Sequence, residues 1–197
     1  MTAYDWFALV AVPIFILLSA FFAGSETALT ASSRASMHRL EKQGNRRAAL
    51  VNRLLNARER LIGALLFGNN AVNIAASALA TGVLLTCFGE VGVIYATLVM
   101  TIVIVVFAEV LPKTAAFNAP NRIALAVARP IDWTVRVLAP VLIGVEWVVK
   151  WALRLAGMKV GETESVLSPH EELRGAVDLL HRTGGVERLD QIGRAHV

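Results

Sequence analysis

Three long stretches of this chain lack lysine and arginine and consist mainly of apolar residues: residues 6–25, 61–88 and 91–112. A helix that crosses a lipid bilayer needs about 20 mainly apolar residues, so each stretch has a suitable length. The sequence therefore predicts an all-α membrane protein. Its three transmembrane helices are expected at about residues 6–26, 61–88 and 91–112.

The composition agrees with a membrane location. Hydrophobic residues make up 56% of the 197 residues, against about 45–50% in ordinary globular domains. All 19 lysine and arginine residues lie outside residues 1–33 and 61–112, a segregation that a soluble core does not need. The first five residues contain no basic segment of the kind that opens a signal peptide. The first apolar helix is therefore expected to be retained.

The distribution of charge predicts how the helices are oriented. Between the first two apolar stretches, residues 34–60 contain eight cations and only two carboxylates, whereas the connector between the second and third stretches has no cation. The cations are Arg34, Arg39, Lys42, Arg46, Arg47, Arg53, Arg58 and Arg60. Because basic loops remain in the cytoplasm, the N-terminus is predicted outside and the C-terminus inside, in the inner or plasma membrane. The basic charge is thereby explained, and no nucleic-acid partner is expected.

Two further segments are predicted to form helices beside the membrane, at about residues 34–58 and 121–156. The first alternates apolar and basic residues at helical spacing, with a break at Gly44-Asn45. The second mixes tryptophan with arginine, which suits the headgroup level of a bilayer. Its longest uncharged run, residues 137–145, is too short for a crossing. The basic loop either contacts anionic headgroups or serves only as a topology signal.

The C-terminal part has a different composition. Residues 157–191 are predicted to form a polar linker and a helix that begins near Ser168 and Pro169. This segment is expected to lead into a soluble domain that the chain does not contain. Residues 192–197 (IGRAHV) match the translation of a common sequencing adapter, and we interpret them as an artefact.

Each apolar stretch carries oxygen-bearing side chains. The candidate metal ligands are Ser19 and Ser25 in the first stretch, Asn70 and Asn73 in the second, and Glu109 in the third. Hydroxyl, amide and carboxylate oxygens are the ligands that a hard cation prefers. A carboxylate inside a membrane is costly and usually faces a partner, a cavity or an ion. The sequence therefore predicts an ion site between the membrane helices.

The spacing of these residues supports a common site. Asn69 and Asn73 are four residues apart and share one helical face, and Asn70 is within reach of Asn73. Pro112 cannot donate a backbone hydrogen bond, so carbonyl groups near Glu109 are expected to be free. Two alternatives remain open, because membrane serines often bond back to their own helix and asparagine can join helices without an ion.

Three short segments together resemble the membrane domain of the CorC/CNNM family: GSETAL at 24–29, GNNAVN at 68–73 and AEVLPK at 108–113. The resemblance extends over roughly residues 10–190. It implies a homodimeric magnesium transporter, with sodium-coupled export, and a following pair of CBS domains that bind ATP with magnesium. The ion ligands it implies are Ser19, Ser25, Asn73 and Glu109. Ala23 and Ala108 depart from the family, where serine and glycine are common.

The function expected is magnesium transport by alternating access, with Mg²⁺ as the transported ion and Na⁺ as the coupling ion. One carboxylate neutralises a divalent ion only in part, which favours release. The alternative is a membrane-anchored scaffold or sensor that regulates another magnesium transporter. An enzyme is not expected, because the spans contain no paired aspartate, HExxH motif or serine–histidine pair. Cys87, the single cysteine, permits no thiolate cluster.

A homodimer within the lipid bilayer is also predicted. Three membrane helices offer little protein to enclose a polar site. The run of small residues at 75–78 permits close packing between helices. The second and third spans are therefore expected to form a two-fold interface, the commonest closed symmetry.

Overall fold

The computed structural model describes residues 3–155, so the predictions for residues 157–191 and 192–197 lie outside the described part. All regular structure in this part is helical. The elements are α1 (Ala3–Ala31), α2 (Arg34–Lys42), α3 (Arg46–Asn56), α4 (Arg58–Phe88), α5 (Val91–Val103), the π-helix η1 (Ile104–Val110), α6 (Leu111–Asn118) and α7 (Pro120–Leu155). The chain divides into two compact units between Trp147 and Val148. Residues 148–155, the described part of the second unit, are helical.

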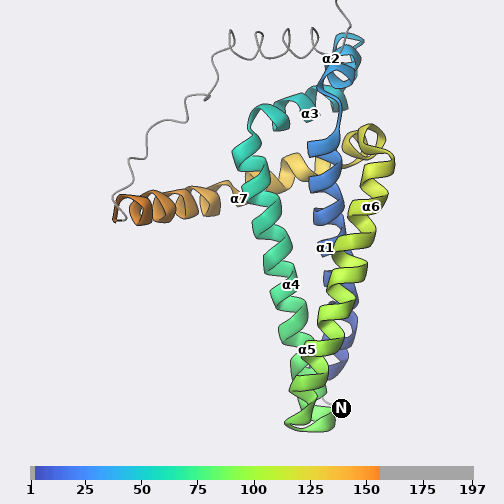
Figure 1. Ribbon diagram of the computed structural model, residues 1–197, viewed down its shortest axis with the longest axis vertical. Helices are drawn as coiled ribbons and strands as arrows, with labels where there is room; N and C mark the ends of the chain where they lie inside the picture. The colour runs from blue at the N-terminus through green and yellow to red at the C-terminus, as the bar shows by residue number, and fades with distance from the viewer. Residues whose placement is uncertain (1–2, 156–197) are drawn as a thin grey trace, which may run out of the picture. The chain divides into compact units, whose positions relative to one another are not determined.

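Three helical segments of the described chain are long and apolar enough to cross a membrane. They are Asp5–Ala31 in α1, Arg58–Phe88 in α4, and Val91–Asn118 across α5, η1 and α6. In Figure 1 these segments run side by side along the long axis. The predicted all-α membrane fold with three transmembrane helices is confirmed.

Two of the predicted helix ends differ from the structure. α1 continues beyond residue 26 to Ala31. Thr27 and Thr30 donate hydrogen bonds to carbonyls of their own helix, those of Ala23 and Glu26, and so remain compatible with it. The third segment continues past Pro112 to Asn118. Pro112 lies in the first turn of α6, where the missing N–H group disturbs the chain least.

A tight turn joins α4 to α5. Gly89 adopts a φ of 64°, which glycine accepts without steric cost. A Cβ atom on Gly92 would lie 2.1 Å from the carbonyl oxygen of Leu84, so the two helix backbones meet where only glycine fits. Thr86 donates a hydrogen bond of 3.3 Å to Asp5, which places this turn beside the start of α1 (Figure 1).

The basic segment after α1 folds into two capped helices. Ser33 accepts a hydrogen bond from the N–H of Ser36 and caps α2. Asn45 accepts from the N–H groups of Arg47 and Ala48 and caps α3. Gly44, with a φ of 85°, separates the two helices. Their apolar faces pack against α1, α4, α6 and α7 in one cluster, which includes Leu29, Met37, Val51, Leu54, Leu61, Ala116 and Ile131.

α7 is one helix that contains both Pro130 and Pro140. Within the first unit it runs across the direction of α1 and α4 (Figure 1). Its buried face contributes Ala124, Ala128 and Ile131 to the cluster, and Trp133 on another face is 68% exposed. The three candidate membrane spans in the described chain do not include α7, and its place along the membrane interface stays a prediction.

Candidate cation site

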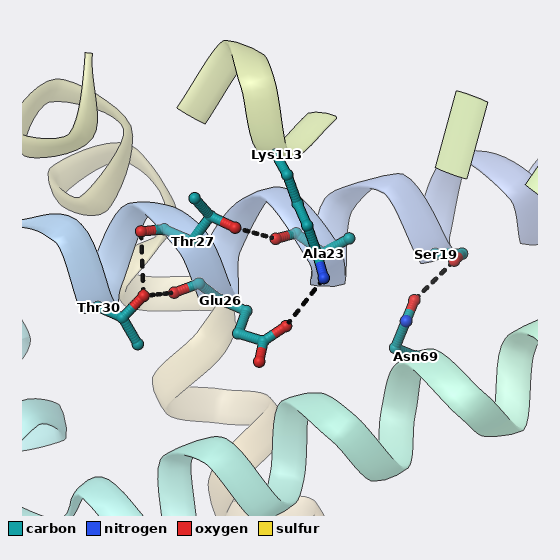
Figure 2. Close-up of polar contacts among 7 residues, drawn as sticks. All are labelled: Ser19, Ala23, Glu26, Thr27, Thr30, Asn69 and Lys113. Carbon is teal, nitrogen blue, oxygen red and sulfur yellow. Dashed lines mark hydrogen bonds and ion pairs between the residues drawn. The ribbon is translucent and has the colours of Figure 1, made fainter. Parts of the chain in front are cut away.

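α1 and α4 cross closely at the level of Ser19. A Cβ atom on Gly68 of α4 would lie 3.0 Å from the ring of Phe22 in α1, so glycine allows the two helices to approach. Beside this contact the buried Ser19 hydroxyl donates a hydrogen bond of 2.6 Å to the side-chain oxygen of Asn69 (Figure 2). This hydrogen bond fixes the position of α4 relative to α1.

α1 meets the third membrane segment a little further along, at Gly24. The position of a Cβ atom on Gly24 is 3.5 Å from both the Cβ and the carbonyl oxygen of Pro112. The backbone of α1 therefore packs directly against η1 and the start of α6 at this point. The segments 24–29 and 108–113, far apart in the sequence, lie together in the fold.

Two buried oxygens in this region have no hydrogen-bond partner among the described residues. They are Oγ of Ser25 and Oδ1 of Asn73. Ser25 is only 1% exposed. A buried polar atom left without a partner costs about 1–3 kcal/mol, and such atoms are rare in native proteins.

α1 and α4 run antiparallel, since Thr86 lies beside Asp5 and Asn69 lies beside Ser19. Ser25 and Asn73 therefore lie on opposite sides of the Ser19–Asn69 hydrogen bond, roughly 15 Å apart along the helices at 1.5 Å per residue. A single cation cannot contact both oxygens, so each is open to a ligand of its own.

Glu109 lies in the π-helix η1 and is half-buried, next to the fully buried Ala108. Its carboxylate makes no ion pair with any described residue. π-Helical turns frequently occur at functional sites. Pro112 has no N–H group, so it cannot bond to the carbonyls four or five residues before it, those of Ala108 and Phe107. Free carbonyl oxygens are thus expected beside Glu109.

The structure separates the three neighbouring asparagines of α4. Asn69 is engaged by Ser19, the side-chain oxygen of Asn73 is buried, and Asn70 is exposed. Asn70, predicted as a ligand, is therefore turned away from the contact between α1 and α4. Asn69 was absent from the predicted ligands, although its four-residue spacing from Asn73 already placed the two on one face.

An ion pair flanks the site and was not foreseen from the sequence. Nζ of Lys113 lies 3.9 Å from a carboxylate oxygen of Glu26 (Figure 2). Glu26 follows Ser25, and Lys113 follows Pro112, so the pair links the two segments that meet at Gly24. The available signal in the sequence was that Glu26 directly follows Ser25 and that Lys113 lies four residues after Glu109.

The chemistry of these donors suits a hard cation. The described residues contain no group of three or more histidine, cysteine, aspartate or glutamate side chains able to hold a metal. Ser25, Asn73 and Glu109 instead supply two neutral oxygens and one carboxylate. Magnesium is commonly held by one or two carboxylates while it keeps several waters. A sparse oxygen site is compatible with that behaviour.

Comparison with known proteins identifies relatives. Residues 10–190 match the family described as the Cyclin M (CNNM) transmembrane N-terminal domain. The UPF0053 inner membrane protein YfjD of Escherichia coli (strain K12) is 40% identical over 164 residues, which cover 81% of this chain and 37% of that protein. A UPF0053 protein of Haemophilus influenzae is 33% identical over 164 residues, covering 83% of this chain and 39% of that protein.

A plant relative extends the comparison. A chloroplastic DUF21 domain-containing protein of Arabidopsis thaliana is 34% identical over 178 residues, covering 88% of this chain and 26% of that protein. The chain therefore spans less than half the length of these curated relatives.

Proposed function

The chain belongs to the family of Cyclin M transmembrane N-terminal domains, and we propose that it is the membrane part of a magnesium transporter. The proposed ligands are Ser25 of α1 and Glu109 of η1 at one level of the helices, and Asn73 of α4 at another. Ser19 holds α4 in position through Asn69. Asn70 is exposed, so we do not propose it as a ligand of the ion within one chain.

One observation carries this proposal. The side-chain oxygens of Ser25 and Asn73 are both buried without a hydrogen-bond partner in the described chain, and they come from helices that pack together. Helix packing alone would favour hydrogen bonds between such groups, as between Ser19 and Asn69. The Ser25 oxygen is free beside the segment that carries the Glu109 carboxylate, since Gly24 contacts Pro112. The Asn73 oxygen is free at another level of the same helices, and we propose that a cation occupies the two positions in turn.

The proposed mechanism is export by alternating access. A cytosolic magnesium ion would lose part of its water shell, be taken up by the Glu109 carboxylate and the Ser25 hydroxyl, and pass Asn73 on its way out. A single carboxylate leaves net positive charge on the bound ion, which keeps release possible. Sodium entering from outside is the proposed driving force. The chain is proposed to work as a homodimer, with its N-terminus outside and its C-terminus in the cytoplasm.

The rest of the longer protein is proposed to regulate this site. The alignments cover less than half of each curated relative, which leaves room for the ATP-binding CBS pair that the family resemblance implies. ATP would bind there and not to the membrane domain. Domain closure around ATP and magnesium would then report the cytosolic magnesium level to the membrane helices.

A scaffold that regulates another transporter is the second candidate. The hydrogen bond between Ser19 and Asn69 favours the scaffold, because it is an example of polar residues here that serve helix packing. A scaffold, however, has no use for the unsatisfied oxygens of Ser25 and Asn73. Flux through the purified protein alone separates the two functions.

The test is magnesium flux in liposomes that contain a magnesium-sensitive dye. The wild-type chain should transport magnesium, and Asn73→Ala should lose most of the flux. Asn70→Ala is the matched control, because it removes the same group from an exposed position three residues away. Absence of flux that returns when a partner protein is added would support the scaffold. Equal loss in both variants would contradict the assignment of Asn73.

A further inference from the structure

A cavity separate from the candidate cation site lies where the start of α4 meets α7. The position of a Cβ atom on Gly63 in α4 is 3.3 Å from Cδ2 of Leu142 in α7, which shows how closely the two helices approach. The cavity beside this contact has a volume of about 230 Å³. Binding pockets that enclose a whole drug-sized molecule measure about 300–1,000 Å³, so this cavity holds only part of a larger ligand.

Its walls combine positive charge with apolar surface. Arg53, Arg60, Arg136 and Asp132 contribute the charges, and Leu142 and Ile143 contribute part of the apolar wall. Three arginines and one aspartate leave two net positive charges. The cavity therefore favours an anionic group attached to an apolar chain.

Asp132 organises two of the arginines. It is 7% exposed and forms ion pairs with Arg136 and, at 3.6 Å, with Arg53. The side chains of Arg53 and Arg136 remain 64% and 61% exposed, so their free N–H groups are accessible to a ligand. Arg60 has no ion pair among the described residues. Pre-positioned guanidinium groups lose less conformational entropy when they bind.

The residues around the cavity are typical of the level where a membrane meets water. Arg60 belongs to the first turn of the membrane-spanning α4, and the exposed Trp133 of α7 is next to Asp132. Tryptophan and arginine are typical of the headgroup region. Ile143, which lines the cavity, is 62% exposed, so the apolar wall continues to the outer surface of α7.

We propose that this cavity binds the phosphate of an anionic membrane phospholipid. Arginine is the side chain best suited to phosphate, because its planar guanidinium group donates two parallel hydrogen bonds. The glycerol and first methylene groups of the lipid would cover Leu142 and Ile143, while the rest of the acyl chains stay in the bilayer. A bound lipid would join α3, α4 and α7 at the base of the membrane helices. The proposal does not depend on magnesium transport.

Native mass spectrometry of the delipidated full chain tests it. Phosphatidylglycerol and phosphatidylcholine with identical acyl chains are the probes, and glycerol phosphate represents a soluble anion. Wild-type chain should bind one phosphatidylglycerol in preference to phosphatidylcholine. Arg60→Gln should weaken phosphatidylglycerol binding about fivefold, as expected for one cation near the membrane surface. Arg47→Gln, an exposed arginine of α3 outside the cavity, is the matched control and should leave binding unchanged.

A second variant tests the apolar part of the cavity. Ala139 also lines it, and Ala139→Phe should fill the space and weaken the binding of both lipids. Three results would overturn the proposal: equal binding of the two lipids to wild type, equal weakening by Arg60→Gln and Arg47→Gln, or displacement of the lipid by glycerol phosphate at a similar concentration. The last result would indicate a site for a soluble phosphate.

Discussion

Ser19 and Ser25 lie on the same helix but have opposite surroundings. Both are buried; Ser19 donates a hydrogen bond to Asn69, whereas Ser25 has no partner in the described chain. A hydrogen bond between membrane helices contributes about 0.6 kcal/mol on average. An unpaired buried oxygen is destabilising until something binds to it. The two serines should therefore respond differently to removal of the hydroxyl group.

Ser19→Ala is expected to lower the free energy of unfolding by about 0.5–1.5 kcal/mol, because one hydrogen bond is lost. Ser25→Ala is expected to leave it unchanged or to raise it slightly in magnesium-free buffer, because an unsatisfied oxygen disappears. Unfolding in mixed micelles, followed by circular dichroism with and without magnesium, measures both effects. Stabilisation of wild type by magnesium that persists in Ser25→Ala would exclude Ser25 as a ligand.

Glu109 supplies the only carboxylate among the proposed ligands. Glu109→Gln keeps the size of the side chain and its hydrogen-bonding capacity but removes the charge, so magnesium affinity should fall by about tenfold or more. Asn73→Ala should weaken binding less, because it removes a neutral oxygen. Isothermal titration calorimetry with magnesium measures these affinities. Glu90→Gln, an exposed carboxylate in the turn between α4 and α5, is the matched control. Unchanged affinity in Glu109→Gln would contradict the cation site.

At the level of helices, the turn between α4 and α5 depends on two glycines, Gly89 with its positive φ and Gly92. A Cβ atom on Gly92 would meet the Leu84 carbonyl at 2.1 Å, and backbone atoms cannot move aside as flexible side chains can. Gly92→Ala is therefore expected to lower the free energy of unfolding by about 1–3 kcal/mol, the range for overpacking. Gly144→Ala, in open space on α7, should be neutral or slightly stabilising. Thermal unfolding of both variants in detergent compares them.

The helices themselves were predictable because length and hydrophobicity decide them. Each apolar stretch exceeds what a bilayer crossing needs, and the cap residues Ser33 and Asn45 mark the starts of α2 and α3. The π-helix η1 was not predicted as an element, because an apolar run such as Ile104–Val110 has the same composition in either helix type. Pro112 indicated disturbed hydrogen bonding nearby but did not specify its form.

The relative rotation of the helices limited the prediction of the site. α4 is apolar on all sides, so its sequence gives no clear inward face. Neighbouring residues such as Asn69 and Asn70 point in directions about 100° apart. The choice between them depends on the packing of α1 against α4 at Gly68 and Phe22, a contact between distant segments. Asn69 contacts Ser19 and Asn70 faces outward for this reason.

For the whole molecule, the distribution of charge predicts the orientation in the membrane. The turn between α4 and α5 lies at the same end as the start of α1, through the contact of Thr86 with Asp5, and the basic helices α2 and α3 lie at the opposite end (Figure 1). The positive-inside rule predicts that α2 and α3 lie in the cytoplasm. Single cysteines at Glu90 and Gln43, in a Cys87→Ser background, should react with an impermeant thiol reagent from opposite sides. Reaction from the same side would contradict three crossings.

The contact surface that we expect for the predicted homodimer is a groove between α4 and α5. The groove has a volume of about 340 Å³ and is lined by Ser77, Thr81, Ala96, Thr97, Met100 and Thr101, among others. Thr81, Thr97 and Thr101 donate their hydroxyl groups to carbonyls of their own helices. These hydroxyl groups already have hydrogen-bond partners, so they add little free polarity to the groove. Most of the side chains that line it are small, which allows another helix to approach closely.

We expect a second copy of the chain to pack against this groove about a two-fold axis. Ser77→Phe would fill the groove and should shift the chain toward the monomer, whereas Leu17→Phe, at a 70% exposed position of α1, should leave the dimer intact. Multi-angle light scattering in mild detergent, at concentrations well above micromolar, measures the mass of each variant. A monomeric wild type would contradict the dimer. A dimer unaffected by Ser77→Phe would place the interface on another face of the helices, because a phenylalanine ring in this groove leaves no room for a second helix.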